Sequence, residues 1–468
     1  MNHKTRRHAK QKNQHRSTDA PEAFPLINPH AAGIDIGAEK HWVAVPADRA
    51  AQPVRCFGCF TADLYALAEW LQHCRITTVA MESTGVYWIP VFQILERQGF
   101  QVKLVNARHV KQVPGRKTDV SDCQWLQRLH TYGLLQGSFR PDDQVCVLRS
   151  YWRHRDTLIQ YAAAHVQHMQ KALTQMNLHL HTVISDITGA TGLRIIRAIL
   201  AGERNPLVLA QMKDCRVQRS VQEIAKALQG DYRAEHLFAL QQALELYEFY
   251  HQQIRACDCQ IQECVQRFES KGTLPTVPLP APQQLSRKPR RNQPSVDLRT
   301  HLYRITGVDF TQIAGLDVST VYTIISEVGL NPHAFPTAKC FASWLGVCPD
   351  NRITGGKVKS SKTRKVVNRA ATAFRLAAQT LARSSSALGG YYRRIRARRG
   401  APKAITATAH KLARLFYHLW KTGQPYVDKG ADYYEKMYHE RVLRTIKRKA
   451  QQLGYHITLQ PINTVQVS

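Results

Sequence analysis

The chain has 468 residues, enough for two or three domains with their own cores. Lysine and arginine number 65 against 34 for aspartate and glutamate, so the formal net charge is +31. This excess favours a nucleic-acid partner, because neutralising phosphates releases condensed counterions. The sequence shows no membrane-spanning apolar run, no secretory signal and no regular spacing of its eleven cysteines. We therefore expect a cytoplasmic protein with reduced, mostly buried thiols and no membrane partner.

The first part of the chain predicts a basic arm followed by an α/β domain. Residues 1–25 are rich in Lys, Arg, His and Gln, so we expect a disordered arm that either contacts phosphate or solubilises the protein. Residues 26–142 alternate strand-like and helical patterns. Their order, β-β-α-β-α-β-α, predicts a sheet with helical covers. Cys56 and Cys59 form one CxxC, but no second pair with zinc-site spacing follows.

Two acids belong to strand-like segments of this domain. Asp35 lies between Gly33 and Gly37, and Glu82 ends the apolar run 77–82. Open α/β sheets bind ligands at the carboxyl ends of their strands. Because a buried strand rarely carries an unpaired charge, each acid needs a partner. That partner is either a metal ion or, as the simpler alternative, a Lys or Arg side chain.

Two further acids, Asp119 and Asp122, follow a basic turn that contains Arg116 and Lys117. Residues three apart share a helix face, and two adjacent carboxylates favour a divalent cation between them. An Asp N-cap with a second acid in the first turn explains the pair as well. Combined with the strand acids, however, the two aspartates suit a two-metal phosphoryl-transfer site.

The middle of the chain, residues 143–269, predicts long helices. Apolar residues recur at three- and four-residue spacing in Tyr151–Thr182 and Ala234–Glu269. This pattern predicts an antiparallel, coiled-coil-like hairpin with shorter helices between its arms. The exposed Arg and Gln faces offer a surface for nucleic acid or another subunit. A Pro-rich basic linker, residues 270–298, then leads to a second helical domain, residues 299–425, and a tail, residues 426–468.

The C-terminal domain contains two candidate DNA-contacting segments. The turn Ile313–Asp317 before a helix over 318–328 resembles a helix-hairpin-helix motif, and a plain helix-loop-helix is the alternative. Next comes a Gly-rich turn bearing hydroxyls at Thr354, Ser360 and Ser361. The cations around it are Lys357, Lys359, Lys362, Arg364, Lys365 and Arg369. Exposed hydroxyls among cations suit attack on a phosphodiester, and a phosphate-binding loop without chemistry fits equally.

The four acids, the long central helices and the Gly346-Val-Cys-Pro349…Thr354-Gly355 segment resemble the DEDD transposases of the insertion-sequence 110 family, in its 1111-like branch. The resemblance covers nearly the whole chain outside the arm and the linker. It implies an RNase H-like (RuvC-like) N-terminal domain and a helical C-terminal transposase domain that supplies a nucleophile. It also implies that a structured non-coding bridge RNA selects donor and target DNA. The Mg²⁺-binding tetrad implied by the resemblance is Asp35, Glu82, Asp119 and Asp122.

Two positions depart from the family pattern. The nucleophile position holds Thr354 where the family has serine, and the threonine methyl group crowds the attack. We predict that Thr354 takes the role, with Ser360, Ser361 or an impaired enzyme as the alternatives. The helix-hairpin-helix motif has Ala314-Gly315 where the family often has Pro-Gly.

These features together predict a transposase that cuts and rejoins DNA through a Mg²⁺-dependent covalent protein–DNA intermediate. We expect a homo-oligomer, a dimer or tetramer, in the bacterial cytoplasm and on the nucleoid when acting. One alternative is a metal-dependent RuvC-like nuclease or Holliday-junction resolvase that uses water as the nucleophile. The other is a non-catalytic RNA- or DNA-binding protein.

Overall fold

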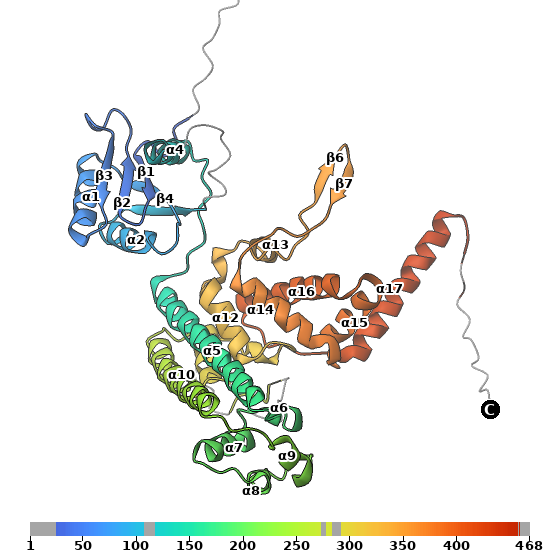
Figure 1. Ribbon diagram of the computed structural model, residues 1–468. Helices are drawn as coiled ribbons and strands as arrows, with labels where there is room; N and C mark the ends of the chain where they lie inside the picture. Colours follow the sequence, from blue (N-terminus) through green and yellow to red (C-terminus); the bar gives the residue numbers. More distant parts are fainter. Residues whose placement is uncertain (1–24, 107–117, 273–277, 283–291, 457, 459–468) are drawn as a thin grey trace, which may run out of the picture. The chain divides into compact units, whose positions relative to one another are not determined.

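The computed structural model describes residues 25–106, 118–272, 278–282, 292–456 and 458 (Figure 1). It divides into two compact units, Met1–Arg140 and Pro141–Ser468. The predicted basic arm, the turn with Arg116 and Lys117, and much of the predicted linker lie outside the described residues. In the part of the chain that the structure describes, no helix is long and apolar enough to cross a membrane.

The N-terminal unit is built on a five-stranded sheet with the strand order β3-β2-β1-β4-β5. The parallel members are β1, β4 and β5, whereas β2 runs antiparallel to both β1 and β3. This mixed sheet with a helical remainder agrees with the predicted fold class. The strands are β1 (Ala31–Ile36), β2 (Lys40–Ala44), β3 (Val54–Gly58), β4 (Thr78–Glu82) and β5 (Gln101–Val105).

The predicted order of elements was wrong at the start of the sheet, where the structure has three strands in place of two. The segment from Ala31 to Val45 folds back on itself at Gly37, whose backbone N–H donates to the Lys40 carbonyl oxygen at 3.0 Å. A Cβ at position 37 would lie 2.6 Å from that oxygen, so the turn requires glycine. The apolar alternation continues on both sides of the turn, which hides the hairpin in the sequence.

The two faces of the sheet are covered by different helices. Helices α1 (Thr61–His73) and α2 (Trp88–Arg97) cover one face, where Ile34, Met81 and Leu67 belong to the main core and are fully buried. Helix α4 (Asp119–Thr131) covers the other face over a smaller apolar cluster of Ala80, Val105, Leu126 and Leu135.

The direction of α4 follows from contacts at its carboxyl end. The Thr131 carbonyl oxygen accepts the backbone N–H groups of Ile27 and Asn28, just before β1, at 3.0 and 2.9 Å. The ring Nε2 of His130 lies 2.9 Å from the Thr78 hydroxyl, where β4 begins. Because α4 ends where β1 and β4 begin, its first turn lies at the edge where those strands end.

The second unit contains an antiparallel pair of long helices, α5 (Asp143–Gln175) and α10 (Ala234–Gln266) (Figure 1). The helix predicted from residue 151 begins and ends earlier than expected, and Asn177, with φ of 57°, follows its end. The predicted apolar stripe is also partly wrong, because Tyr161, Leu246 and Phe249 are about half exposed. Four shorter helices lie between the long ones: α6 (Leu180–Val183), α7 (Ala190–Leu200), α8 (Pro206–Gln211) and α9 (Val221–Ala227).

The rest of this unit is helical around an aromatic core, in which Phe310 and Phe416 stack at 4.2 Å and Phe341 packs beside them. Its helices are α11 (Leu298–Thr306), α12 (Val318–Val328), α13 (Ala338–Trp344), α14 (Arg369–Thr380), α15 (Ala387–Arg399), α16 (Ala401–Thr422) and α17 (Gly430–Gln452). Three 3₁₀ turns are η1 (Phe310–Gln312), η2 (Pro332–Ala334) and η3 (Leu381–Arg383), and one hairpin pairs β6 (Arg352–Thr354) with β7 (Lys357–Ser360).

Arginines of α5 join the long helices to the C-terminal helices. Arg155 donates to Asp258 of α10 at 2.5 Å, and both side chains are almost fully buried. Asp258 also accepts from the backbone and hydroxyl of Ser295, at 3.0 and 3.1 Å. Arg153 forms two hydrogen bonds with the Glu327 carboxylate of α12 at 2.9 and 2.8 Å. These contacts attach α12 and the end of the predicted linker to the helix pair.

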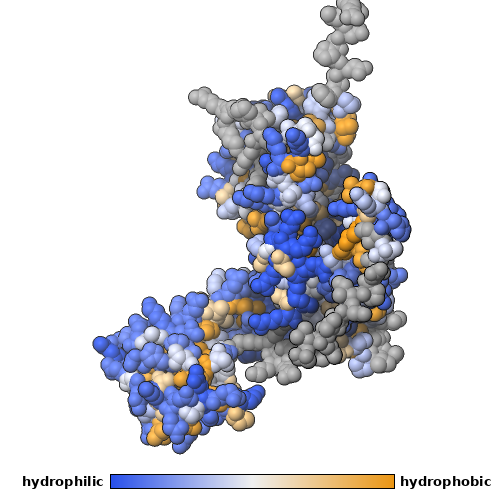
Figure 2. Space-filling view, turned by 90° about the vertical axis from the view of Figure 1, so that its right-hand side faces the viewer, coloured by the Kyte–Doolittle hydropathy of each residue, from blue (hydrophilic) through white to orange (hydrophobic). Residues whose placement is uncertain are grey.

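The surface view shows a largely hydrophilic face on which hydrophobic residues form small separate patches (Figure 2). The prediction of mostly buried thiols was wrong: three of the cysteines are buried, and Cys56, Cys59, Cys215, Cys259 and Cys340 are exposed. Cys56 is exposed because it belongs to β3, the edge strand of the sheet.

We expect Arg155→Ala to destabilise the second unit by about 3–5 kcal/mol, because the substitution leaves the Asp258 carboxylate buried without its charged partner. The control is Arg197→Ala, which removes a surface pair with Glu248 and should cost less than about 1 kcal/mol. Urea unfolding followed by circular dichroism measures both. A loss of less than about 1 kcal/mol in Arg155→Ala would contradict the role of Arg155 as the charged partner of the buried Asp258 carboxylate.

His130 makes the stability of the N-terminal unit depend on pH. Burial, with a smaller contribution from Lys103, lowers the pKa of His130 from 6.5 to about 4. Below about pH 6.5 the unfolded chain therefore binds the extra proton first, and the unfolding free energy falls towards pH 4 by up to about 1.4 kcal/mol per pH unit. Calorimetry of the full chain should show a weaker pH dependence in His130→Gln. An unchanged dependence would exclude His130 as its source.

Candidate active site

Asp35 and Glu82 lie side by side at the carboxyl edge of the sheet. The parallel strands β1 and β4 pair Ile34 with Met81, and the two acids are the next residues on each strand. Side chains alternate along a strand, and Ile34 and Met81 face the α1/α2 core. Asp35 and Glu82 therefore face the α4 side, and both are partly buried. The placement of Val105, which pairs with Glu82, in the α4-side cluster agrees with this.

Gly33 lets α4 approach this part of the sheet closely. A Cβ at position 33 would lie 2.4 Å from the Cys123 carbonyl oxygen and 2.3 Å from the Gln127 backbone nitrogen. Gly33 and Asp35 are two residues apart and share a face. The backbone of α4 therefore lies against β1 next to Asp35, and Cys123 immediately follows Asp122. Close backbone approach is a function of Gly33 that the sequence pattern did not specify.

The start of α4 is capped by Thr118 and not by an aspartate. The Thr118 hydroxyl accepts the backbone N–H of Ser121 at 3.2 Å, and the Ser121 hydroxyl reaches back to the Thr118 backbone. Asp119 and Asp122 belong to the first helical turn. The alternative in which an aspartate is the N-cap was therefore wrong. The positive end of the helix dipole still favours both carboxylates there.

Cys123, which sequence reasoning did not select, reports the electrostatics of this edge. Its thiol is fully buried and donates to the Val120 carbonyl oxygen at 3.2 Å. Burial first, and then the carboxylates of Asp35 and Asp122, raise the pKa of Cys123 to about 12. Acids from a strand and from a helix thus act on one thiol. The only sequence signal for this contact is the glycine at position 33 that accommodates α4.

The described residues contain no group of three His, Cys, Asp or Glu side chains arranged to hold a metal ion. The structure brings Asp35 next to Glu82 in register and Asp35 and Asp122 close to one thiol; convergence of the complete tetrad remains a prediction. The available donors are carboxylate oxygens, which are the ligands Mg²⁺ prefers. The donor set at this edge therefore fits the predicted metal.

The predicted nucleophile lies on the β6–β7 hairpin. Thr354 ends β6, pairs with Lys357 and is exposed. Gly355 and Gly356 form the turn with φ of 55° and 72°, a two-residue connection that requires the left-handed region. Ser361 is also exposed, whereas Ser360 is half-buried, and its hydroxyl accepts the backbone N–H of Lys362 at 3.3 Å. Thr354 is therefore the hydroxyl nearest the hairpin tip.

The cations predicted around this hairpin fall into two groups. In the first group the side chains are exposed and have no hydrogen bond or ion pair assigned within the described residues. This group is Lys357, Lys359, Lys362 and Lys365. In contrast, Arg364 donates to the Ser343 carbonyl oxygen at 2.5 Å, and Arg369 lies 3.3 Å from the Asp156 carboxylate of α5. The two arginines therefore also stabilise the fold. The predicted contacts of Arg116 and Lys117 fall outside the described residues.

The helix-hairpin-helix interpretation of Ile313–Asp317 does not fit the structure. Ile313, Ala314 and Leu316 are buried, and a Cβ at Gly315 would lie 2.9 Å from the Ala377 carbonyl oxygen of α14. The turn packs inside the unit and does not present its backbone to solvent. The apolar composition that resembled the motif instead provides core contacts.

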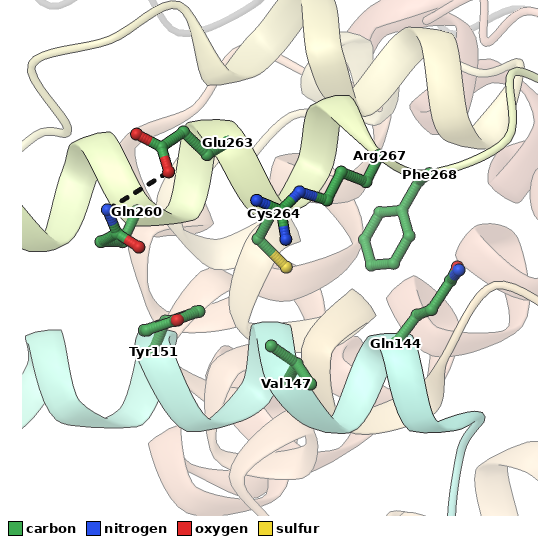
Figure 3. Close-up of a pocket in the computed structure, with 8 residues that line it drawn as sticks. All are labelled: Gln144, Val147, Tyr151, Gln260, Glu263, Cys264, Arg267 and Phe268. Atoms are coloured by element: carbon green, nitrogen blue, oxygen red, sulfur yellow. Dashed lines mark hydrogen bonds between the residues drawn. The ribbon is translucent and has the colours of Figure 1, made fainter.

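A cavity of about 170 Å³ lies elsewhere, between the start of α5 and the end of α10 (Figure 3). Val147 and Tyr151 line it from α5, and Cys264 and Phe268 line it from the opposite side. Burial raises the pKa of the Cys264 thiol. None of the predicted site residues lines this cavity.

Two family models match the chain. Residues 32–178 match a transposase model of the DEDD type from the IS110 group. Residues 309–393 match the model described as the transposase IS116/IS110/IS902 family. Both models describe transposase domains of the IS110 type. A search of the curated proteins found no match.

The two matched segments support a DNA transposase or recombinase, and thus a role in transposition of an insertion sequence. The first transposase segment includes all four predicted acids, and the second includes Thr354. The DEDD type of the first domain indicates use of a divalent metal, and a transposase implies DNA as the substrate.

We expect Gly33→Ala to push α4 away from β1, because the backbone atoms of Cys123 and Gln127 in α4 leave no space for a methyl group. The N-terminal unit should lose roughly 1–3 kcal/mol of stability. Metal-dependent DNA cleavage should fall by more than this loss explains. Gly137→Ala is the control, because there the added Cβ meets the flexible Lys103 side chain at 3.2 Å. Equal behaviour of the two variants in unfolding and cleavage assays would contradict the close packing of α4.

Proposed function

We propose that this chain is a transposase that cuts and rejoins DNA at specific sites through a covalent protein–DNA intermediate. The observation that carries the proposal is the packing of α4 against Gly33. This packing agrees with a position of the first turn of α4, which carries Asp119 and Asp122, near the sheet edge that holds Asp35 and Glu82. The match to a DEDD transposase domain over the same residues supports it.

In this proposal the four carboxylates bind Mg²⁺, which when bound polarises the scissile phosphodiester and stabilises the charge that develops on it. The Thr354 hydroxyl attacks phosphorus. A bond forms between threonine Oγ and phosphorus, and the bond from phosphorus to the leaving strand breaks. The hydroxyl proton ends on the leaving oxygen. Rejoining reverses these steps with the end of another strand, so each joined phosphodiester replaces a broken one.

The exposed lysines of the hairpin bind the phosphates that flank the attacked one. Lys357 is the cross-strand partner of Thr354, and Lys359 lies on the same strand. Cations beside the nucleophile stabilise negative charge on phosphorus in the transition state. The threonine methyl group restricts χ1, so these contacts also have to orient the hydroxyl.

The remaining parts of the proposal concern partners. The proposal includes a homo-oligomer, a dimer or tetramer, as the active form, in line with the family resemblance. A structured non-coding RNA, as the resemblance implies, selects the donor and target DNA. The net charge of +31 supports binding of both nucleic acids. The protein then acts on the nucleoid in the bacterial cytoplasm.

The test is to trap covalent DNA adducts on a denaturing gel, using labelled DNA that contains the ends of the element together with RNA from the flanking region. Thr354→Ala should reduce adduct and strand exchange by at least about 100-fold, because the attacking oxygen is gone. Thr354→Ser should retain both. Asp35→Asn and Asp122→Asn should abolish both while the chain stays folded.

Ser360→Ala and Ser361→Ala are the matched controls and should form adduct normally. If one of them loses the adduct instead, that serine is the nucleophile. Cleavage without adduct in Thr354→Ala would show a metal-dependent nuclease that uses water. Strand exchange that survives Asp35→Asn would contradict the tetrad, and DNA binding without cleavage in the unmodified protein would favour a non-catalytic nucleic-acid-binding role.

A further inference from the structure

Helix α17 (Gly430–Gln452) lies beyond both segments that match the transposase models. Its first half packs on α15 and α16. Arg394 forms an ion pair with Glu435, and the rings of Tyr391 and Tyr434 meet edge to face at 6.1 Å. The Lys411 ammonium lies 4.4 Å from the Tyr391 ring and 5.3 Å from the Tyr434 ring. The start of α17 is therefore firmly held.

The second half of α17 is different, because most of its side chains are exposed. Between Arg441 and Lys449 the helix carries five cations and no acid, and none of these nine residues is buried. Arg444 has a surface ion pair at 3.8 Å with Glu440, one turn before it on the same helix. In Figure 1 this half extends past α15. The helix dipole favours the cations nearest the carboxyl end, and the whole cluster also suits a polyanionic ligand.

The cations follow one face of the helix. Arg441, Arg444 and Arg448 line, with Met437 and Thr445, a surface hollow of about 440 Å³. The spacings of three and four residues place these side chains on one stripe, rising about 1.5 Å per residue. At 3.6 residues per turn, Lys447 and Lys449 fall on opposite sides of this stripe. The guanidinium stripe is thus flanked by an ammonium group on each side.

We propose that the second half of α17 binds duplex DNA along its major groove, with the three arginines and the two flanking lysines contacting the phosphates that border the groove. A helix about 10–12 Å wide fits the major groove of B-DNA, about 12 Å across. The major groove of A-form RNA is deep and narrow and does not admit such a helix. The proposal rests on the proposed function only in taking DNA as the partner.

The proposed binding to DNA is electrostatic, so the binding constant should depend on salt concentration to an extent that can be calculated. Each phosphate neutralised on duplex DNA contributes about 0.9 to the slope of log binding constant against log salt concentration. Replacing the three arginines together should reduce the slope by about 2–3, if each neutralises a phosphate directly or replaces counterions in the groove. Replacement by lysine should preserve most of the slope, because it preserves the charge.

The experiment measures binding of the full chain to a random-sequence 30-base-pair DNA duplex, an RNA duplex and a single-stranded RNA by fluorescence anisotropy at several salt concentrations. The test variant is Arg441→Gln with Arg444→Gln and Arg448→Gln, and the Lys triple variant at the same positions reports on charge. The control removes three exposed cations from the central helices: Lys171→Gln, Lys226→Gln and Arg255→Gln. Circular dichroism confirms that α17 stays helical.

The proposal predicts that the test variant loses slope and affinity for the DNA duplex, whereas the control and the Lys variant do not. An equal loss in the control would show a general charge effect and overturn it. A loss confined to an RNA duplex or single-stranded RNA would assign α17 to the RNA instead. Because no cleavage is measured, failure here leaves the adduct experiment intact, and failure of the adduct experiment leaves this result standing.

Discussion

The second unit depends on one buried charge pair. Arg155 of α5 and Asp258 of α10 are almost completely removed from solvent, and the loss of either side chain would leave the other charge buried without a partner. Their remaining hydrogen-bonding capacity is used by the chain that follows the helices: Asp258 accepts from Ser295, and Arg155 donates to the Asn292 carbonyl oxygen at 3.1 Å. The pair therefore also attaches the segment that leads into α11. Together with the Arg153–Glu327 pair, it joins the helix pair to the C-terminal helices.

A second constraint acts on the N-terminal unit, and it involves the absence of a side chain. Gly33 allows the backbone of α4 to lie against β1, and the His130–Thr78 contact holds the other end of the helix at the start of β4. Because these two contacts hold α4 against the sheet, the position of its first turn is fixed. Backbone packing thus holds this turn close to β1, and the buried Cys123 thiol feels the carboxylates of both Asp35 and Asp122.

The sequence predicted much of this arrangement and missed the parts that depend on contact. The apolar runs located β4 and α12 to within a residue, because alternation and helical spacing are local properties. The acids were identified as a group by their strand and helix positions. The β1–β2 hairpin was missed because the apolar alternation passes through Gly37. The Ile313–Asp317 turn was misinterpreted because its sequence does not indicate whether the turn is buried in the core or exposed to DNA. Arg155 could not be distinguished from the other arginines of α5, since its partner lies 103 residues away.

The β6–β7 hairpin has one more consequence. Ile353 and Val358, paired across its strands, are 60% and 57% exposed, so the unit that carries Thr354 does not hold the hairpin against its own core. In-line attack needs one particular orientation of the hydroxyl, and the core of this unit does not supply the contacts that would fix it. The reaction would then require the assembled DNA complex to order the hairpin. The proposed transposase would thus not cut DNA until the complete complex has formed.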